Sequence, residues 1–135
     1  MLTVTDVMKQ EVITIEEDAP ITQAIEIMLE NKISGLPVVT SDMTLVGIIT
    51  EKDVLSLYGV PEEGAKAKVR DLMTSPAVYF EMFETLSDIC RCLIKNDFRR
   101  VPVVLEGKVV GIISRPDVTK HILKLVRETT SLGRA

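Results

Sequence analysis

An internal duplication is the feature that most constrains how this chain can fold. The stretch GIITEKDV at residues 47–54 returns as GIISRPDV at residues 111–118, and PVV at 37–39 returns at 102–104. Equivalent residues are 65 positions apart at PVV and 64 positions apart at the octet, because the segment TSDMT in the first copy corresponds to the shorter LEGK in the second. A hairpin tip tolerates such a one-residue change best. The chain is therefore predicted to contain two copies of one supersecondary unit.

Each copy also contains a segment with the periodicity of an amphipathic helix. Its apolar residues follow the i, i+3, i+4, i+7, i+8 spacing that predicts one buried face. They are Ile21, Ala24, Ile25, Met28 and Leu29 in the first copy, and Leu86, Ile89, Cys90, Leu93 and Ile94 in the second. Asp18 with Pro20, and Thr85 with Asp88, are typical of helix starts.

Strand-like segments surround each predicted helix. Short strands are predicted at 12–15 and 77–80, before the helix, and a hairpin follows it. A second helix is predicted from about Glu51 in the first copy and from about Arg115 in the second. The predicted fold class is therefore α+β, with two tandem β-α-β-β-α repeats.

A repeat of this size has too small a core to be comfortably stable alone. We expect the two copies to bury their sheet faces against each other about a pseudo-twofold axis, leaving two equivalent clefts between them. The stretch YGVPEEGAKAK, which contains glycine and proline, predicts a linker. The predicted division is 1–58 for repeat 1, 59–68 for the linker, 69–128 for repeat 2 and 129–135 for a C-terminal tail.

The composition disfavours several classes of protein. A formal net charge of −4 argues against nucleic acid as a partner. No apolar run reaches membrane-spanning length and the N-terminus lacks a signal-peptide layout, so we expect a cytoplasmic protein without a membrane partner. Cys90 and Cys92 are predicted to be buried small hydrophobic residues. His121 has no partner at metal or triad spacing and no catalytic motif occurs, so we expect no enzyme and no metal.

The end of the repeated octet supports two interpretations. Thr50 with Asp53, and Ser114 with Asp117, have the spacing of a capping box at a helix start. The same helix start presents free N–H groups and a positive dipole end, which suit a phosphate. The hydroxyl could donate to that phosphate, and the aspartate could accept from ribose hydroxyls. From these residues alone, both the structural and the ligand-binding interpretation stay open.

The chain resembles a cystathionine-β-synthase (CBS) domain pair, also called a Bateman module. The resemblance rests on the order of four motifs, which are SGLPVV and GIITEKD in the first copy and RRVPVV and GIISRPD in the second. The resemblance covers about residues 1–128. It implies a regulatory module that binds an adenosine-type ligand, such as AMP, ADP, ATP or S-adenosylmethionine, in the clefts between repeats. It also implies a homodimer, and it gives Asp53 and Asp117 the role of binding ribose.

The other wall of each predicted cleft is the end of the first helix and the start of the hairpin. Its candidate ligand-binding residues are Ile33, Ser34, Gly35, Leu36 and Pro37 in the first copy, and Phe98, Arg99, Arg100, Val101 and Pro102 in the second. Apolar side chains and open backbone groups there suit an adenine ring, although Leu36 could serve core packing alone.

Basic and aromatic residues make the second predicted cleft different from the first. Arg99, Arg100 and Arg115 are candidates for phosphate recognition, and Lys52 is their weaker counterpart in the first copy. Surface charge is the alternative for each arginine. Tyr79 could stack on adenine, as could Phe98. Thr14, which aligns with Tyr79, is a residue type that the family places near the ligand.

Two functions from different classes follow. The first is an adenine nucleotide sensor that signals to an unidentified partner protein. The second is a ligand-independent dimerisation scaffold, in which Ile27 and Cys92 widen the apolar stripe of the first helix in each repeat.

Overall fold

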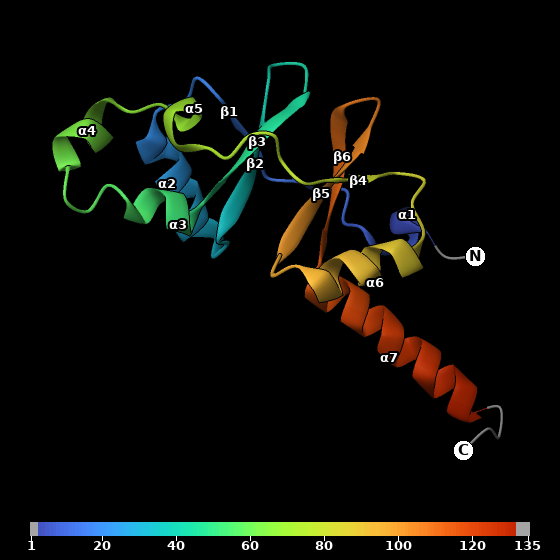
Figure 1. Cartoon of the computed structure of the whole chain (residues 1–135). Helices are drawn as coiled ribbons and strands as arrows, with labels where there is room; N and C mark the ends of the chain where they lie inside the picture. The colour runs from blue at the N-terminus through green and yellow to red at the C-terminus, as the bar shows by residue number, and fades with distance from the viewer. Residues whose placement is uncertain (1–2, 132–135) are drawn as a thin grey trace. The chain divides into compact units, whose positions relative to one another are not determined.

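The computed structural model describes residues 3–131 of the chain as seven helices and two three-stranded sheets (Figure 1). The helices are α1 (Val4–Val7), α2 (Ile21–Asn31), α3 (Glu51–Leu55), α4 (Pro61–Lys66), α5 (Val69–Leu72), α6 (Leu86–Lys95) and α7 (Arg115–Ser131). The strands are β1 (Ile15–Glu16), β2 (Gly35–Val39), β3 (Leu45–Thr50), β4 (Phe80–Glu81), β5 (Arg100–Leu105) and β6 (Lys108–Ser114).

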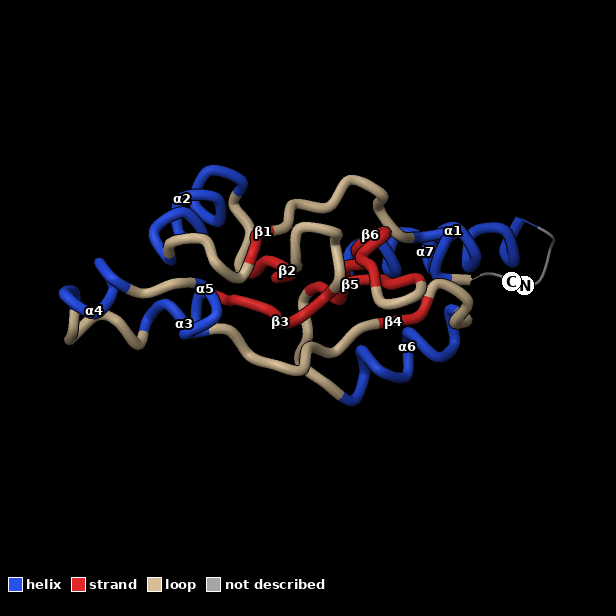
Figure 2. The backbone as a smooth tube through the Cα atoms, turned by 90° about the horizontal axis from the view of Figure 1, so that it is seen from above, coloured by secondary structure: helices blue, strands red, loops and turns tan. Residues whose placement is uncertain are grey.

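Both sheets have the same topology, as the duplication predicts. One has the order β1-β2-β3 and the other β4-β5-β6, with the short first strand parallel to its neighbour in each case. Figure 2 shows the strands in red with α2 and α3 beside the first sheet and α6 beside the second. The predicted α+β class and the β-α-β-β-α order within each repeat are therefore confirmed.

The described residues form two compact units that exchange segments between the sequence repeats. Unit 1 contains residues 3–11, 79–105 and 110–131, and unit 2 contains 12–78 and 106–109. The segment that leads the first repeat thus belongs to the core built by the second repeat. The segment that leads the second repeat belongs to the core built by the first. The linear division at residues 58, 68 and 128 stays a prediction about the sequence repeats.

A buried valine anchors each exchanged segment. Val4, fully buried, packs in the unit 1 core, and Val69, also fully buried, packs in the unit 2 core. The unit 1 core consists of Val4, Phe80, Leu86, Ile89, Leu93, Val101, Val103, Ile113 and Val118. The unit 2 core consists of Ile15, Ile21, Ala24, Met28, Leu36, Val38, Ile49 and Val69. Burial of these apolar side chains is the main stabilising contribution within each unit.

The exchanged segments explain the glycine that opens each repeated octet. In unit 2 the backbones of Ile48 and Thr74 exchange hydrogen bonds of 3.0 and 2.9 Å, so residues 73–74 cross directly over Gly47. A Cβ on Gly47 would lie 2.7 Å from Met73 Sδ and 2.9 Å from the Thr74 carbonyl oxygen. Such distances leave no room for a side chain at this position.

Unit 1 repeats this arrangement. Lys9 and Ile112 exchange backbone hydrogen bonds of 2.8 and 2.9 Å, and a Cβ on Gly111 would collide with Met8 Sδ and lie 3.1 Å from the Lys9 carbonyl oxygen. Each copy of the octet therefore requires its glycine, because the lead segment of the other repeat crosses it there.

Several sequence predictions need correction. Leu29 and Ile94 were assigned to buried helix faces, but they are 71% and 84% exposed. Each lies at the edge of its apolar stripe, 80° around the helix from the first stripe residue at 100° per residue, and so turns away from the core. The short strands begin three residues later than predicted, at Ile15 and Phe80.

Helix starts and cysteines show smaller differences. Thr85 caps α6 as predicted, accepting from Asp88 N at 3.2 Å, whereas Asp18 forms an ion pair with Arg70 and caps nothing. The pair of cysteines, predicted to be buried, is half-buried against the unit 1 core.

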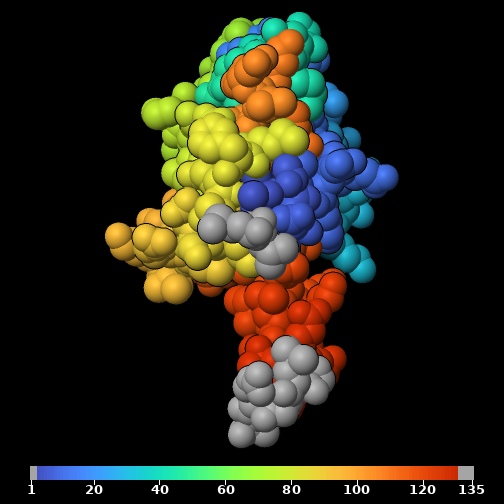
Figure 3. Space-filling view, turned by 90° about the vertical axis from the view of Figure 1, so that its right-hand side faces the viewer, coloured from blue at the N-terminus to red at the C-terminus, as the bar shows by residue number. Residues whose placement is uncertain are grey.

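The predicted linker and tail are largely helical. The linker contains α4, and α7 runs through residue 131 into the predicted tail, whose residues 132–135 lie outside the described part. All side chains of α7 from Ile122 to Thr130 are exposed, and Figure 3 shows this part of the helix, in red, standing clear of the rest of unit 1. Between residues 3 and 131, no helix is long and apolar enough to cross a membrane.

Candidate functional site

A hydroxyl and a carboxylate meet where β3 passes into α3 in unit 2. Asp53 Oδ2 accepts from the backbone N–H of Thr50 at 2.8 Å and from its hydroxyl at 3.0 Å. In return, the backbone N–H of Asp53 donates to Thr50 Oγ1 at 3.4 Å. The predicted capping box is therefore present.

The start of β2 lies beside this cap. Gly35 is the cross-strand partner of Thr50, and the backbone N–H of Glu51 donates to the Ser34 carbonyl at 2.9 Å. Ser34, Gly35, Thr50 and Asp53 are thus brought together, and we call them the first cluster. All four residues are half-buried, so the cluster keeps access to solvent.

Unit 1 holds the equivalent group where β6 passes into α7. Asp117 Oδ2 accepts from the backbone N–H of Ser114 at 3.0 Å and from its hydroxyl at 2.7 Å. The backbone N–H of Arg115 donates to the Arg99 carbonyl at 3.3 Å. Arg99, Arg100, Ser114 and Asp117, at the positions equivalent to the first cluster, form the second cluster.

Lys9 gives the second cluster a cation that the sequence analysis missed. Its Nζ lies 3.6 Å from Asp117 Oδ1, and the Asp117 side chain is 8% exposed while that of Lys9 is 66% exposed. Lys9 arrives on the exchanged lead segment. The duplication aligns Lys9 with Thr74, which crosses β3 in unit 2. This alignment could have placed Lys9 across β6, but no sequence spacing identified Asp117 as its partner.

The arginines near the second cluster are not equivalent. Arg115, a predicted phosphate ligand, instead donates from Nη2 to the carbonyls of Leu93 and Asn96, at 3.4 and 3.0 Å, and to Asp97. Its guanidinium therefore ties the start of α7 to the end of α6. Arg99 and Arg100 are exposed, and neither takes part in the ion pairs found among residues 3–131.

The remaining predicted residues fall into three groups. Leu36, Val101, Pro37 and Pro102 are buried, and Leu36 and Val101 belong to the two cores, so their side chains serve packing. Ile33 and Phe98 are half-buried and pack against the cores. The third group lies outside the cores. Thr14, just before β1, is half-buried, whereas Tyr79, just before β4, and Lys52, on α3, are exposed.

The geometry shows that capping does not use up the aspartates. Each cap is made by one carboxylate oxygen, Oδ2. Within the described residues, Oδ1 of Asp53 accepts no hydrogen bond and Oδ1 of Asp117 faces only the exposed Lys9 ammonium. Because a carboxylate oxygen has two acceptor sites, Oδ1 can accept from a ligand hydroxyl while the cap stays intact. The two interpretations of the octet are therefore compatible.

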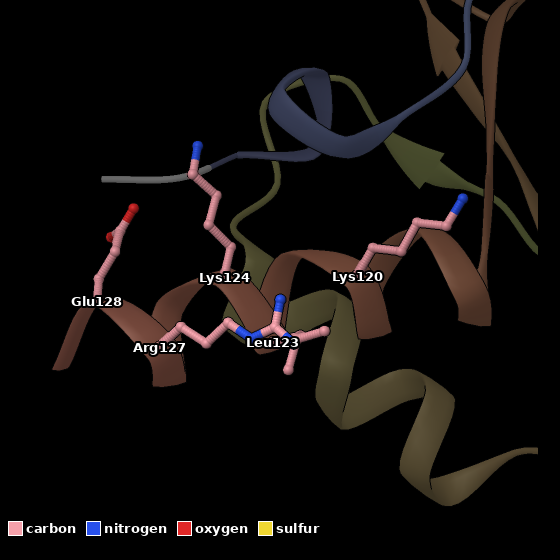
Figure 4. Close-up of a pocket in the computed structure, with 5 residues that line it drawn as sticks. All are labelled: Lys120, Leu123, Lys124, Arg127 and Glu128. Atoms are coloured by element: carbon pink, nitrogen blue, oxygen red, sulfur yellow. The ribbon is translucent and has the colours of Figure 1, made fainter. Parts of the chain in front are cut away.

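A hollow of about 360 Å³ lies away from both clusters, on α7 (Figure 4). Its lining residues are Lys120, Leu123, Lys124, Arg127 and Glu128, all from one helix. Across residues 3–131, no three histidine, cysteine or acidic side chains gather as a metal site would require. Among these same residues, the Nε2 atom of His121 is buried and has no hydrogen-bond partner.

Comparison with known proteins places the fold in one family. The profile of the CBS domain matches residues 4–59 and again residues 69–124. The protein MJ1225 of Methanocaldococcus jannaschii is 36% identical over 117 residues, which cover 87% of this chain and 41% of that protein. The chloroplastic CBS domain-containing protein CBSX2 of Arabidopsis thaliana is 30% identical, and 63% of its length is covered. The chain thus spans less than two thirds of these two relatives.

Solved structures of CBS pairs share the fold over nearly the whole chain. The structure of CBSX2 in complex with AMP has a TM-score of 0.81 and 33% identity, covering 93% of this chain and 98% of the other. The CBS pair of MJ0100, in complex with 5′-methylthioadenosine and S-adenosyl-L-methionine, has a TM-score of 0.76 and 26% identity, covering 90% and 96%. This chain therefore belongs to the CBS domain family and carries two CBS domains in tandem, at residues 4–59 and 69–124.

Proposed function

We propose that the chain is a regulatory CBS pair that binds an adenosine-type ligand at the first and second clusters and signals its presence to a partner protein. CBS pairs are generally regulatory modules rather than catalysts, and we propose no catalytic role. The observation that carries the proposal is that each cap uses only Oδ2 of its aspartate, which leaves Oδ1 of Asp53 without a hydrogen bond among the described residues and Oδ1 of Asp117 facing the Lys9 ammonium. Complexes of related CBS pairs with AMP and with S-adenosyl-L-methionine support the ligand class.

The aspartates are proposed to bind the ribose. Two vicinal hydroxyls can donate to one carboxylate, and a charged acceptor makes such hydrogen bonds stronger than neutral ones. The caps hold both carboxylates in fixed orientations, which lowers the entropy cost of binding. The half-buried Ile33 and Phe98 are proposed to contact adenine, with Thr14 and Tyr79 as further contacts.

The two clusters are proposed to differ in their preference for phosphate. The second cluster includes Arg99 and Arg100 and has Lys9 beside Asp117, whereas the first cluster has Ser34 and Gly35 at the equivalent positions, with Lys52 next to Asp53 on α3. We therefore propose that the second cluster prefers AMP, ADP or ATP. Arg115 joins the phosphate contacts only if its guanidinium leaves the carbonyls at the end of α6.

Thermal unfolding tests the proposal directly. Melts with AMP, ADP, ATP, NADH and S-adenosylmethionine, each added alone, should show a higher midpoint with at least one. A ligand at a hundred times its dissociation constant adds about 2.7 kcal/mol, roughly 10 °C for a chain of this length. Unchanged midpoints with all five compounds at millimolar concentration would contradict the sensor function.

Aspartate variants separate ligand binding from capping. Asp53→Ala and Asp117→Ala should each lose about 1 kcal/mol of stability through the cap, and should also lose the ligand-induced shift. Asp71→Ala is a matched control, since Asp71 accepts from Lys68 N at 2.8 Å at the start of α5, outside both clusters. It should lose stability but keep the shift. Equal ligand shifts in all three variants would remove the aspartates from the site.

The second candidate function, a ligand-independent dimerisation scaffold, is favoured by a different observation. Ile27 and Cys92, proposed to widen an exposed stripe, are half-buried against the cores. The exposed apolar side chains on α2 and α6 are instead Leu29 and Ile94. These two residues occupy equivalent positions in the two repeats, and burying them against a partner would favour association. Light scattering of the nucleotide-free protein tests this scaffold.

A further inference from the structure

Two methionines occupy equivalent places in the two repeats. Met8 corresponds to Met73, at the same separation of 65 residues as the two PVV motifs. Met8 precedes Lys9 and Met73 precedes Thr74, and the second residue of each pair exchanges two backbone hydrogen bonds with a strand, β6 or β3. Each methionine therefore lies where a lead segment crosses a strand. Neither belongs to the first or the second cluster.

The sulfur of each methionine occupies the space above the glycine that opens the octet. A Cβ on Gly47 would lie 2.7 Å from Met73 Sδ and 3.2 Å from Met73 Cγ. A Cβ on Gly111 would collide with Met8 Sδ and lie 3.1 Å from Met8 Cγ. The thioether thus fills the place that a side chain on the strand would take, and the glycine and the methionine form one packed pair in each unit.

Both methionine side chains keep part of their surface in solvent. Met8 and Met73 are half-buried, and they pack against the unit 1 core and the unit 2 core, respectively. Met28, by contrast, is 4% exposed within the unit 2 core. Met43, between β2 and β3, is also half-buried but belongs to neither core. These four methionines differ in access to solvent and in contact with a crossed strand, and only Met8 and Met73 combine the two.

We propose that Met8 and Met73 are oxidation sites at which a peroxide loosens the crossing segments from their strands. The sulfur lone pair attacks one oxygen of hydrogen peroxide, and an S–O bond forms as the O–O bond breaks. The second oxygen takes up the proton of the first and leaves as water. The sulfur is oxidised by two electrons and the peroxide is reduced by two, so thioether and hydrogen peroxide give sulfoxide and water. This reaction makes a flexible apolar side chain polar.

A sulfoxide does not suit the place that the thioether occupies. Its oxygen is a hydrogen-bond acceptor, and burying it without a donor is unfavourable. In unit 2 the nearby backbone N–H groups of Met73 and Thr74 already donate, to the carbonyls of Val69 and Ile48. The equivalent N–H groups of unit 1 are used in the same way. A side chain that turns to water instead leaves an empty space above the glycine and gives up its packing on the core. Both results weaken the contact between segment and strand.

Peroxide treatment of the whole chain tests the proposal without any nucleotide, so the result does not depend on the proposed ligand. Peptide mass mapping should then find sulfoxide at Met8 and Met73, and the thermal midpoint should fall by about 5 °C or more. Hydrogen exchange should become faster at the amides of Lys9 and Thr74, which pair with the strands. Methionine sulfoxide reductases A and B with a dithiol return the thioether and yield a disulfide and water, and this reduction should restore the midpoint of the same sample.

Leucine variants identify the responsible sulfur atoms. Leucine has a similar volume and no sulfur, so the double variant Met8→Leu/Met73→Leu should fold and should lose little of its midpoint under the same peroxide treatment. It keeps both cysteines, so any loss caused by thiol oxidation would remain in it. Met43→Leu is the matched control, and its loss should equal that of wild type. If the double variant does not fold, the oxidation and reduction cycle of the wild-type chain decides the question.

Three results overturn the proposal. The first is sulfoxide at Met43 but at neither Met8 nor Met73, because both sulfur atoms would then be closed to peroxide. The second is complete oxidation of Met8 and Met73 with an unchanged midpoint. The third is an equal loss of midpoint in wild type and in the double leucine variant, which would assign the loss to another methionine, such as Met82, or to the thiols.

Discussion

Replacing Gly47 by alanine should destabilise unit 2, because the new methyl group has no space. The Cβ would lie 2.7 Å from Met73 Sδ and 2.9 Å from the Thr74 carbonyl oxygen. The thioether can rotate away, but the carbonyl is fixed by the hydrogen bond it accepts from Ile48 N at 3.0 Å. Accommodating the methyl group therefore requires the crossing segment to move away from β3.

Three contributions set the magnitude. Overpacking in a close-packed interior costs about 1–3 kcal/mol. Loss of the two backbone hydrogen bonds between Ile48 and Thr74 adds about 1 kcal/mol each if the segment lifts off completely. Alanine also restricts the unfolded chain, which offsets about 0.4–1 kcal/mol. We expect a net loss of about 2 kcal/mol, which lowers the thermal midpoint by about 6–10 °C in a chain of this length.

Thermal and urea unfolding followed by circular dichroism measure this loss. Gly59→Ala is the matched control, because nothing lies within 4 Å of its added Cβ, and its stability should stay within about 0.5 kcal/mol of wild type. The double variant Gly47→Ala/Met73→Ala should lose less stability than the sum of its single variants, since removing the thioether relieves one of the two collisions. A Gly47→Ala midpoint equal to that of Gly59→Ala would refute the crossing geometry.

Three further predictions follow from the described contacts. Gly111→Ala should lower the thermal midpoint, as Gly47→Ala does in unit 2. An unchanged midpoint would mean that the lead segment crosses the octet glycine closely in unit 2 but not in unit 1. Hydrogen bonds from Thr40 and Thr44 lower the pKa of Asp42 from 3.8 to about 2. Its contribution to stability is therefore present above about pH 4 and lost as the pH falls toward 2, so Asp42→Asn should reduce the acid sensitivity of urea midpoints measured between pH 5 and pH 2. Ile89→Ala should cost about 2–5 kcal/mol in urea unfolding because Ile89 is fully buried in unit 1, and a loss below 1 kcal/mol would contradict that burial.

Local spacing made much of the fold and of the candidate site predictable. A hydroxyl three residues before an aspartate at a helix start indicates a capping box, and both octets form one where this spacing predicts it. The duplication then transferred each local assignment to a second place. It predicted two sheets of equal topology and two clusters at the same strand-to-helix junctions.

Contacts between distant residues were not predictable in this way. Lys9 meets Asp117 across more than a hundred residues, and Val4 is buried in a core built by the other repeat. The sequence contained the repeated Val-x-Asp-x-Met pattern of both lead segments, but no periodicity tells which core a short segment joins. Exchange of the segments satisfies the same local pattern as packing within one repeat, and only the tertiary contacts distinguish the two.

The repeated octet alone therefore cannot decide between a structural and a ligand-binding role. Its glycine is required by a crossing segment and its aspartate by a cap, so both would be retained in a chain that binds nothing. Chemical differences at equivalent places are more informative, because the fold does not demand them. Lys9 replaces the threonine of the other copy, and Arg99 and Arg100 replace a serine and a glycine, each time adding a cation to the second cluster. Identical scaffolds with unequal charge favour two sites of different ligand preference over two structural caps, and separate ligand titrations of the Asp53→Ala and Asp117→Ala chains measure that inequality.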